Sequence, residues 1–370
     1  MEDIFVGRVR VGGYQGARLH GADHHKRAVR ARAPLRLGLA GDGTDLPSYS
    51  EAFGGAVLNA TIDRYAFASI QPRDDGCLVF DACDIGQKET HAATSAVPGS
   101  RLLLHRGVYE HMVRKYNKNR PLTITITTVV DAPMGSGLGS SSALVVALIE
   151  AYCAYLDVQL DRLELAHLAH QIERIDLGLA GGQQDQFSAT FGGINFIEFL
   201  QGGRVIVNPL RFRQPVINEL ESSLVVCFSG PSRMPDRIIR QQLERLDAGS
   251  AETLEAMHGL KEDASEMKIA VLLGDMERFA AVLERSWLAK KHTAPDISNP
   301  VIDDLEALGR RNGAVAAKLS GAGGGGFMMF VVPPERRYRL ITALNDAGNP
   351  AYPVKLTECG SEAWTIPARD

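Results

Sequence analysis

The stretch DAPMGSGLGSSSALVVALIEAY, residues 131–152, joins a loop of small residues to a long apolar run. Its first dozen positions hold three glycines and four serines. Glycine removes the Cβ atoms that would keep a ligand away from backbone N–H groups, and the helix predicted next presents unpaired N–H groups and the positive end of its dipole. Such a place suits a phosphate group.

A second stretch, KLSGAGGGGF at residues 318–327, has five glycines in six positions between two strand-like segments. Each stretch alone could be a tight turn, but a turn needs fewer glycines, so the second favours close approach of the backbone to a ligand. Two common nucleotide motifs do not match. No lysine follows Gly139 as in a P-loop, and no strand–helix–strand unit carries the dinucleotide fingerprint.

The composition restricts the possible functions. The chain has 370 residues, enough for two domains, and a net charge of -4, which excludes a broad attraction for nucleic acid. Five scattered cysteines contain no C-x-x-C pair, so we expect a reducing, cytoplasmic setting. The apolar runs are shorter than the ~18 residues that a membrane span requires, and we therefore expect no membrane segment.

Helical and strand patterns are mixed along the chain, which predicts an α+β fold. The compact pattern begins near residue 31, and residues 1–30 are expected to be a loose extension without the apolar core of a secretory signal. Glycines and prolines surround a short hairpin at residues 200–215, where we place the boundary between a domain of residues 31–205 and a domain of residues 206–370.

Three segments together resemble the motifs of the GHMP kinases, the superfamily of galactokinase, homoserine kinase and mevalonate kinase. They are APLRLGLAGDGTD (33–45), PMGSGLGSSSA (133–143) and KLSGAGGGGF (318–327), in the family's order and spacing. The resemblance implies an N-terminal half like domain 2 of ribosomal protein S5, a ferredoxin-like C-terminal half and an active site between them. It also implies ATP, Mg²⁺ and a hydroxyl group as acceptor.

The resemblance implies that both glycine-rich loops bind ATP. The expected ATP-binding residues are Pro133, Gly135, Ser136, Gly137, Leu138, Gly139, Ser140, Ser141, Gly323 and Gly324. Ser141 falls where the family has its magnesium-coordinating serine, and Glu173 resembles its acidic partner for the metal. Ser142 stands where many members have alanine, so the metal-binding serine could be either of these two neighbours.

Asp185 and Arg36 match the catalytic carboxylate and the basic residue that pairs with it in the family. The carboxylate accepts the proton of the acceptor hydroxyl in several members. From the residues alone, Asp185 could equally cap a short helix, and Arg36 could lie on the surface of a strand. Arg36 alternates with Leu35 and Leu37, and we expect it to face the opposite side of the strand from them.

The acceptor site is expected near the first motif. Thr44 and Asp45 occupy positions at which related sugar kinases bind hydroxyl groups, and Gly182 and Gly321 complete the predicted set. Asp42 stands where relatives have glycine or glutamate, which could change the hydroxyl preference. Arg233, Lys290 and Lys291 are the candidates for holding a phosphate group on the acceptor.

Within the superfamily, segments such as GGAVLNATIDRYAFASI and GLAGGQQDQF are most similar to heptose phosphate kinases. This similarity implies transfer of the γ-phosphate of ATP to the anomeric hydroxyl of a heptose 7-phosphate, giving a 1,7-bisphosphate for nucleotide-activated heptose. Another C1 sugar kinase, similar to fucokinase or galactokinase, or a non-catalytic sensor of sugar and ATP remain alternatives. We expect a monomer or homodimer without nucleic-acid or membrane partners.

Overall fold

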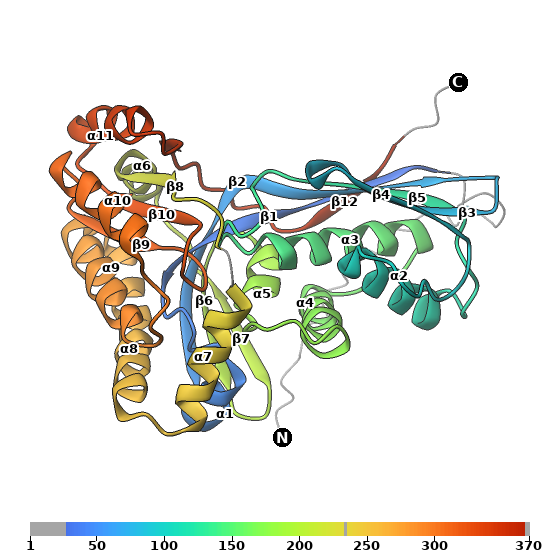
Figure 1. The fold of residues 1–370 in the computed structure, drawn as a ribbon, viewed down its shortest axis with the longest axis horizontal. Helices are drawn as coiled ribbons and strands as arrows, with labels where there is room; N and C mark the ends of the chain where they lie inside the picture. The colour runs from blue at the N-terminus through green and yellow to red at the C-terminus, as the bar shows by residue number, and fades with distance from the viewer. Residues whose placement is uncertain (1–26, 233–234, 367–370) are drawn as a thin grey trace, which may run out of the picture.

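Two β-sheets organise the fold (Figure 1). In the computed structural model, which describes residues 27–232 and 235–366, eight strands form the first sheet and four form the second. The first sheet has the order β12-β1-β2-β5-β3-β4, and β6 and β7 extend it beside one end of β2. Its strands are β1 (Val29–Ala40), β2 (Gly55–Pro72), β3 (Cys77–Ala82), β4 (Gln87–Ala92), β5 (Ile124–Val130), β6 (Ile194–Leu200), β7 (Arg204–Pro209) and β12 (Glu362–Thr365).

Helix α3 (Ser140–Leu156) is the centre of the first half (Figure 1). Its apolar run has no polar face, as is typical of a buried helix, and it packs on β1 and β2 with other helices around it. These neighbours are α2 (Leu103–Tyr116), α4 (Arg162–His170) and α5 (Gln184–Phe191). The remaining short elements of this half are α1 (Pro47–Phe53), the 3₁₀ turn η2 (Cys83–Ile85) and the π-helical segment η3 (Gln171–Asp176).

The second half has a four-stranded antiparallel sheet in the order β11-β8-β10-β9. Together with its helices, this order is the βαββαβ arrangement of a ferredoxin-like domain, as the family resemblance implied. Its strands are β8 (Leu224–Phe228), β9 (Ala316–Leu319), β10 (Phe327–Val331) and β11 (Ala351–Pro353). Its helices are α6 (Gln214–Ser223), α7 (Pro235–Asp247), α8 (Ala251–Leu273), α9 (Met276–Lys291), α10 (Pro300–Arg311) and α11 (Pro334–Asp346).

The strand pairing differs from the predicted division of the chain in three places. Strand β7 crosses residue 205 and pairs with β6 in the first sheet. After β11, the chain returns to that sheet, where β12 pairs with β1. Strand β1 begins at Val29, which is buried, so the last residues of the expected extension belong to the sheet. Residues 1–26 of that extension lie outside the described residues.

One buried histidine belongs to the core of the first half. His105 of α2 is 2% exposed, packs 5.7 Å from the ring of Phe80 and shares a 2.9 Å hydrogen bond with Thr128. Burial disfavours the charged imidazole and lowers the pKa of His105 to about 4 from the usual 6.5. The folded protein therefore holds this histidine neutral at neutral pH.

We expect His105 to make the fold sensitive to acid. Between pH 6.5 and 4 the unfolded chain binds a proton at this residue that the folded chain does not, so the free energy of unfolding falls as the pH falls through this window. The loss attributable to His105 should reach roughly 3 kcal/mol. Urea titrations at pH 7 and pH 4.5 measure it. The variant His105→Gln should lose less stability over this interval, and an equal loss in both proteins would contradict the assignment.

Candidate active site

The first glycine-rich loop leads directly into α3. Gly135, Gly137 and Gly139 all have φ near the left-handed value, at 71°, 72° and 72°. A side chain at these positions would strain the backbone, which explains the alternation of glycine with other residues. Gly139 is the N-cap of α3, and no described side chain caps this helix. Its first N–H groups therefore stay available to a ligand.

The second glycine-rich loop lies against the first, backbone to backbone. The amide of Phe327 donates to Ser136 O at 2.8 Å, and the hydroxyl of Ser320 donates to Gly137 O at 3.0 Å. A Cβ atom on Gly137 would lie 2.4 Å from Ser320 O, and one on Gly321 would lie 2.6 Å from Gly137 Cα. Gly137 and Gly321 are therefore needed because the two loops pack directly on each other, whether or not a ligand also approaches them.

A cavity of about 550 Å³ opens beside the two loops and is lined by residues from both halves of the protein. Gly135, Ser136, Gly137, Gly139, Ser140 and Ser141 line it, as do Gly321 and Ala322 of the second loop. Pro133, Leu138, Gly323 and Gly324 are outside this lining. Gly323 packs on Ile297, and Gly324 packs near Ile238. The backbone of these two glycines therefore approaches other parts of the protein and not the cavity.

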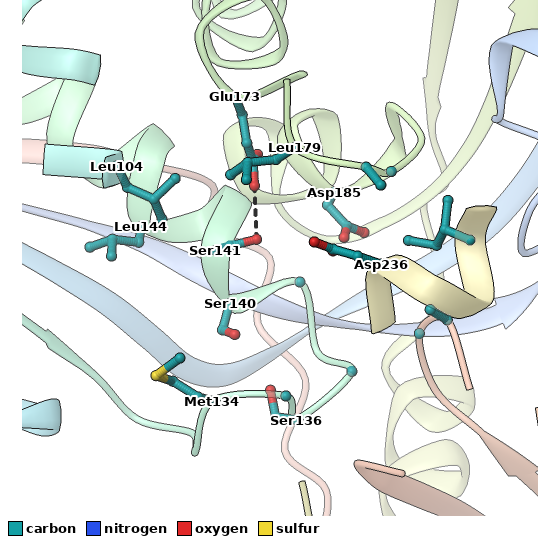
Figure 2. Close-up of a pocket in the computed structure, with 18 of the residues that line it drawn as sticks. Leu104, Met134, Ser136, Ser140, Ser141, Leu144, Glu173, Leu179, Asp185 and Asp236 are labelled. Carbon is teal, nitrogen blue, oxygen red and sulfur yellow. Dashed lines mark hydrogen bonds between the residues drawn. The ribbon is translucent and has the colours of Figure 1, made fainter. Parts of the chain in front are cut away.

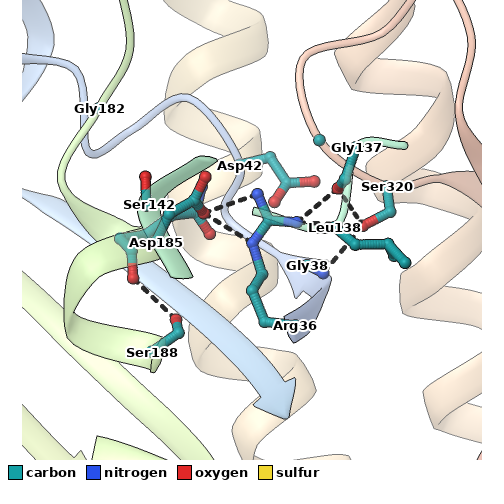
Figure 3. Close-up of polar contacts among 12 residues, drawn as sticks. Arg36, Gly38, Asp42, Gly137, Leu138, Ser142, Gly182, Asp185, Ser188 and Ser320 are labelled. Carbon is teal, nitrogen blue, oxygen red and sulfur yellow. Dashed lines mark hydrogen bonds and ion pairs between the residues drawn. The ribbon is translucent and has the colours of Figure 1, made fainter. Parts of the chain in front are cut away.

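Asp185 and Arg36 meet at the edge of this cavity (Figure 3). Arg36 Nε donates to Asp185 Oδ1 at 2.7 Å, and its Nη2 lies 2.6 Å from the same oxygen. Arg36 Nη1 donates to Gly137 O at 2.6 Å, so the guanidinium ties the carboxylate to the first loop. Asp185 Oδ2 makes no hydrogen bond to the described residues and remains free to accept a proton.

Glu173 of η3 lies beside the start of α3 and is held by donors on two elements, α3 and α5. Ser141 Oγ donates to one carboxylate oxygen at 2.8 Å (Figure 2). Ser142 Oγ donates to the other at 2.7 Å. Gln186 Nε2 donates to it at 2.7 Å. Because the Ser141 hydroxyl gives its proton to Glu173, its lone pairs stay available on the cavity side. Both serines contact Glu173, but Ser141 lines the cavity and Ser142 does not.

Asp42 is buried between two lysines. Its Oδ2 accepts from Lys290 Nζ at 3.1 Å and from Lys318 Nζ. Burial alone would raise the pKa of Asp42, but the two lysines hold it well below its usual range. Burial lowers the pKa of Lys318 to about 8, against the attraction of Asp42. Sequence reasoning missed Lys318, although a lysine inside the buried strand AAKL signals a cation that needs a partner.

The ion-pair cluster of Asp42, Lys290 and Lys318 bears on the roles predicted for two acceptor-binding residues. Lys290, expected as a phosphate-binding residue, is 1% exposed, and it donates to Asp42 and to Gly321 O. Asp42, expected to influence hydroxyl preference, has its charge neutralised by the same lysines, although both residues line the cavity. Arg233, another expected phosphate-binding residue, lies outside the described residues.

The other predicted acceptor residues differ in their access to the cavity. Thr44 donates to Gly41 O or Ala56 O, both at 2.8 Å, and is not part of the lining. Asp45 lines the cavity and accepts from the amide of Gln184 at 3.0 Å, and burial raises its pKa. A Cβ atom on Gly182 would lie 1.9 Å from Asp45 Oδ2, so a side chain there would displace the Asp45 carboxyl group.

Three cavity residues come from α7, which sequence reasoning did not connect with the site. They are Asp236, Ile239 and Gln242. Their helical spacing was visible in the sequence, but nothing in it showed that this face of the helix lies against the cavity.

Comparison with known proteins identifies the class of the protein. Residues 103–193 match the model of the GHMP kinases N terminal domain, and residues 267–350 match that of the GHMP kinases C terminal domain. The chain therefore belongs to the GHMP kinases and is a kinase, and the predicted two-domain GHMP fold is confirmed.

Particular relatives are similar over nearly the whole chain. The D-glycero-alpha-D-manno-heptose 7-phosphate kinase of Campylobacter jejuni is 40% identical over 92% of this chain and 100% of its own length. The crystal structure of a D-glycero-D-manno-heptose 1-phosphate kinase from Bacteriodes thetaiotaomicron is 39% identical, covers 92% of this chain and 100% of that one, and has a TM-score of 0.78. A mevalonate kinase of Pyrococcus abyssi is 27% identical over 90% of this chain and 97% of its own length. Among the described helices, none is long and apolar enough to cross a membrane.

We expect the contact between the two loops to tolerate no side chain at Gly137. The change Gly137→Ala forces a Cβ atom into Ser320 O and should displace the loop, weakening the binding of an ATP analogue by about 100-fold in titration calorimetry. Gly202→Ala is the matched control, because Gly202 has a similar φ of 76° and open space around its Cβ position. It should cost about 1 kcal/mol of stability and leave nucleotide affinity unchanged. Equal affinities of the two variants would contradict this role of the contact.

Proposed function

We propose that this kinase transfers the γ-phosphate of ATP to the anomeric hydroxyl of D-glycero-D-manno-heptose 7-phosphate and forms the 1,7-bisphosphate. The observation that carries the proposal is the Asp185–Arg36 pair, which faces the cavity beside the first glycine-rich loop. The two heptose phosphate kinases among its relatives support the choice of acceptor. Formation of a sugar bisphosphate suits a place in the synthesis of nucleotide-activated heptose.

The proposed reaction needs one proton acceptor. The anomeric oxygen forms a bond to the γ-phosphorus while the bond from that phosphorus to the β,γ-bridging oxygen breaks, and ADP leaves. Asp185 Oδ2 accepts the proton of the hydroxyl, since Oδ1 is occupied by Arg36. Arg36 holds Asp185 in place and adds positive charge beside the transferred group. The free N–H groups at the start of α3 bind the phosphates without a P-loop lysine.

Ser141 and Glu173 fit a magnesium ion. A hydroxyl with free lone pairs next to a carboxylate is an oxygen donor pair of the kind that Mg²⁺ prefers, and the ion takes its other ligands from phosphates and water. When bound, Mg²⁺ neutralises charge on the triphosphate. Glu173 has its remaining hydrogen bonds from Ser142 and Gln186, which fix the orientation of its carboxylate.

A panel of acceptors tests the proposal. The purified full chain is given ATP and Mg²⁺, and release of ADP is measured with heptose 7-phosphate, heptose 1-phosphate, free heptose, galactose, fucose and mevalonate. The names of the two similar kinases differ in the phosphate on the sugar, so both heptose phosphates belong in the panel. We expect the highest kcat/KM with heptose 7-phosphate and phosphorus on its anomeric oxygen by NMR. Turnover of free hexoses alone would exclude this acceptor, and ATP binding without turnover of any sugar would favour a sensor.

We expect Asp185→Asn to lower kcat by about 10²- to 10⁴-fold, because the amide cannot accept the hydroxyl proton. The KM for ATP should stay close to that of the wild type. Asp304→Asn, on the exposed side of α10, is the matched control and should keep full activity. An undiminished kcat in Asp185→Asn would show that positioning, without proton transfer, is the role of this residue.

A further inference from the structure

We propose that the cavity-facing side of α7, formed by Asp236, Ile239 and Gln242, binds the hydroxyl groups of the acceptor sugar and determines which sugar is accepted. This inference rests on the proposed function and assigns the recognition of the acceptor to residues of the second half. Asp236 is the principal specificity-determining residue, and Gln242 supports it.

The positions of the three residues place them on one side of α7. Residues three and six positions apart lie within one stripe of a helix, and all three line the cavity together with Asp45, Gly182 and Asp185. Figure 2 shows the Asp236 side chain pointing from α7 toward Asp185 and Ser141. The stripe therefore faces the end of the cavity where the proposed proton acceptor lies.

Most other polar side chains at this end of the cavity are already committed. Asp42 is bound by two lysines, and Asp45 accepts from the amide and the side chain of Gln184. Arg36 is bound to Asp185. Asp236, by contrast, makes no hydrogen bond or ion pair with any of residues 27–232 and 235–366. Its two oxygens are therefore acceptors without a described partner, beside Asp185 Oδ2 and the unpaired buried oxygens of Asp42 and Gln184.

Gln242 has one free oxygen in a fixed place. Its Nε2 donates to Thr293 Oγ1 at 2.6 Å, and Thr293 Oγ1 donates to Lys290 O at 2.8 Å. This chain of hydrogen bonds fixes the amide plane, while Gln242 Oε1 has no partner in the part of the chain that the structure describes. Ile239, between the two polar residues, offers an apolar surface for the C–H face of a sugar ring.

The chemistry of this stripe selects hydroxyl groups. A carboxylate and an amide oxygen only accept hydrogen bonds, and each hydroxyl of a sugar can donate one. The Asp236 carboxylate has no cationic partner among the described residues, so the acceptor's own phosphate group would be repelled from its vicinity. The stripe therefore orients a polyhydroxylated acceptor with its own phosphate away from Asp236.

An aspartate in the first turn of a helix also stabilises the helix dipole, and that role alone would explain the residue type. A role in the helix dipole alone would not predict that Asp236 affects the KM for the acceptor sugar. Measuring this KM together with kcat and the stability of the protein therefore separates stabilisation of the helix from binding of the acceptor.

The test compares Asp236→Asn and Gln242→Leu with the control Asp247→Asn, a change at an exposed position of the same helix outside the cavity. Steady-state release of ADP is measured with heptose 7-phosphate, or with whichever sugar the acceptor panel selects. We expect Asp236→Asn to raise the KM for the acceptor by about 10- to 100-fold, the size of a lost hydrogen bond to a charged group. The KM for ATP and the urea midpoint should stay near wild type. Gln242→Leu should raise the acceptor KM less, and Asp247→Asn should not change it.

Other outcomes contradict the inference. The inference is overturned if Asp236→Asn leaves the KM for the acceptor unchanged. This holds even if the same variant changes the KM for ATP or the Mg²⁺ requirement. If wild-type protein rejects heptose phosphates but uses another sugar, the proposed function fails, and the same comparison on that sugar still decides the role of α7. Absence of turnover with every sugar would overturn both.

Discussion

The direct contact between two glycine-rich segments is the constraint on which the site depends. Gly137 and Gly321 meet with no side chain between them, and any Cβ atom would separate the halves of the protein locally. The same two residues also anchor side chains of the site. Gly137 O accepts from Arg36, and Gly321 O accepts from Lys290. The backbone of each loop therefore fixes both the proposed phosphate-binding surface and the charged side chains that surround it.

The contact between the loops also brings several buried charged side chains together. Arg36, Lys290 and Lys318 carry three positive charges, while Asp42 and Asp185 carry two negative charges close to them. Buried charges need partners, and the pairs supply them within hydrogen-bond distance. Within this group one positive charge is in excess, but Asp45 and Asp236 add two further carboxyl groups to the same cavity. Arg36, which joins Asp185 to the first loop, is the cation placed to stabilise a phosphoryl group in the proposed reaction.

Local patterns in the sequence predict much of this protein, and contacts across the chain account for what they miss. The apolar run of α3 and the spacing of Gly135, Gly137 and Gly139 predict a buried helix entered through a bare loop. Asp42 and its two lysines are 248 and 276 residues apart, so no local pattern could pair them. The glycines at 323 and 324 indicated close approach, but the sequence could not show that Ile297 and Ile238 are what they approach.

The return of the chain to the first sheet has a mechanical consequence. Strand β12 lies beside β1, and the amide of Asp63 on β2 donates to Lys355 O just before it at 2.8 Å. The ferredoxin-like half is thus an insertion in the chain: the chain leaves the first sheet after β7 and rejoins it at β12. Helices α8 and α9 also pack on strands of the first sheet, so the second half is held by side chains as well as by its two chain connections. The two glycine-rich loops therefore keep one fixed position relative to each other.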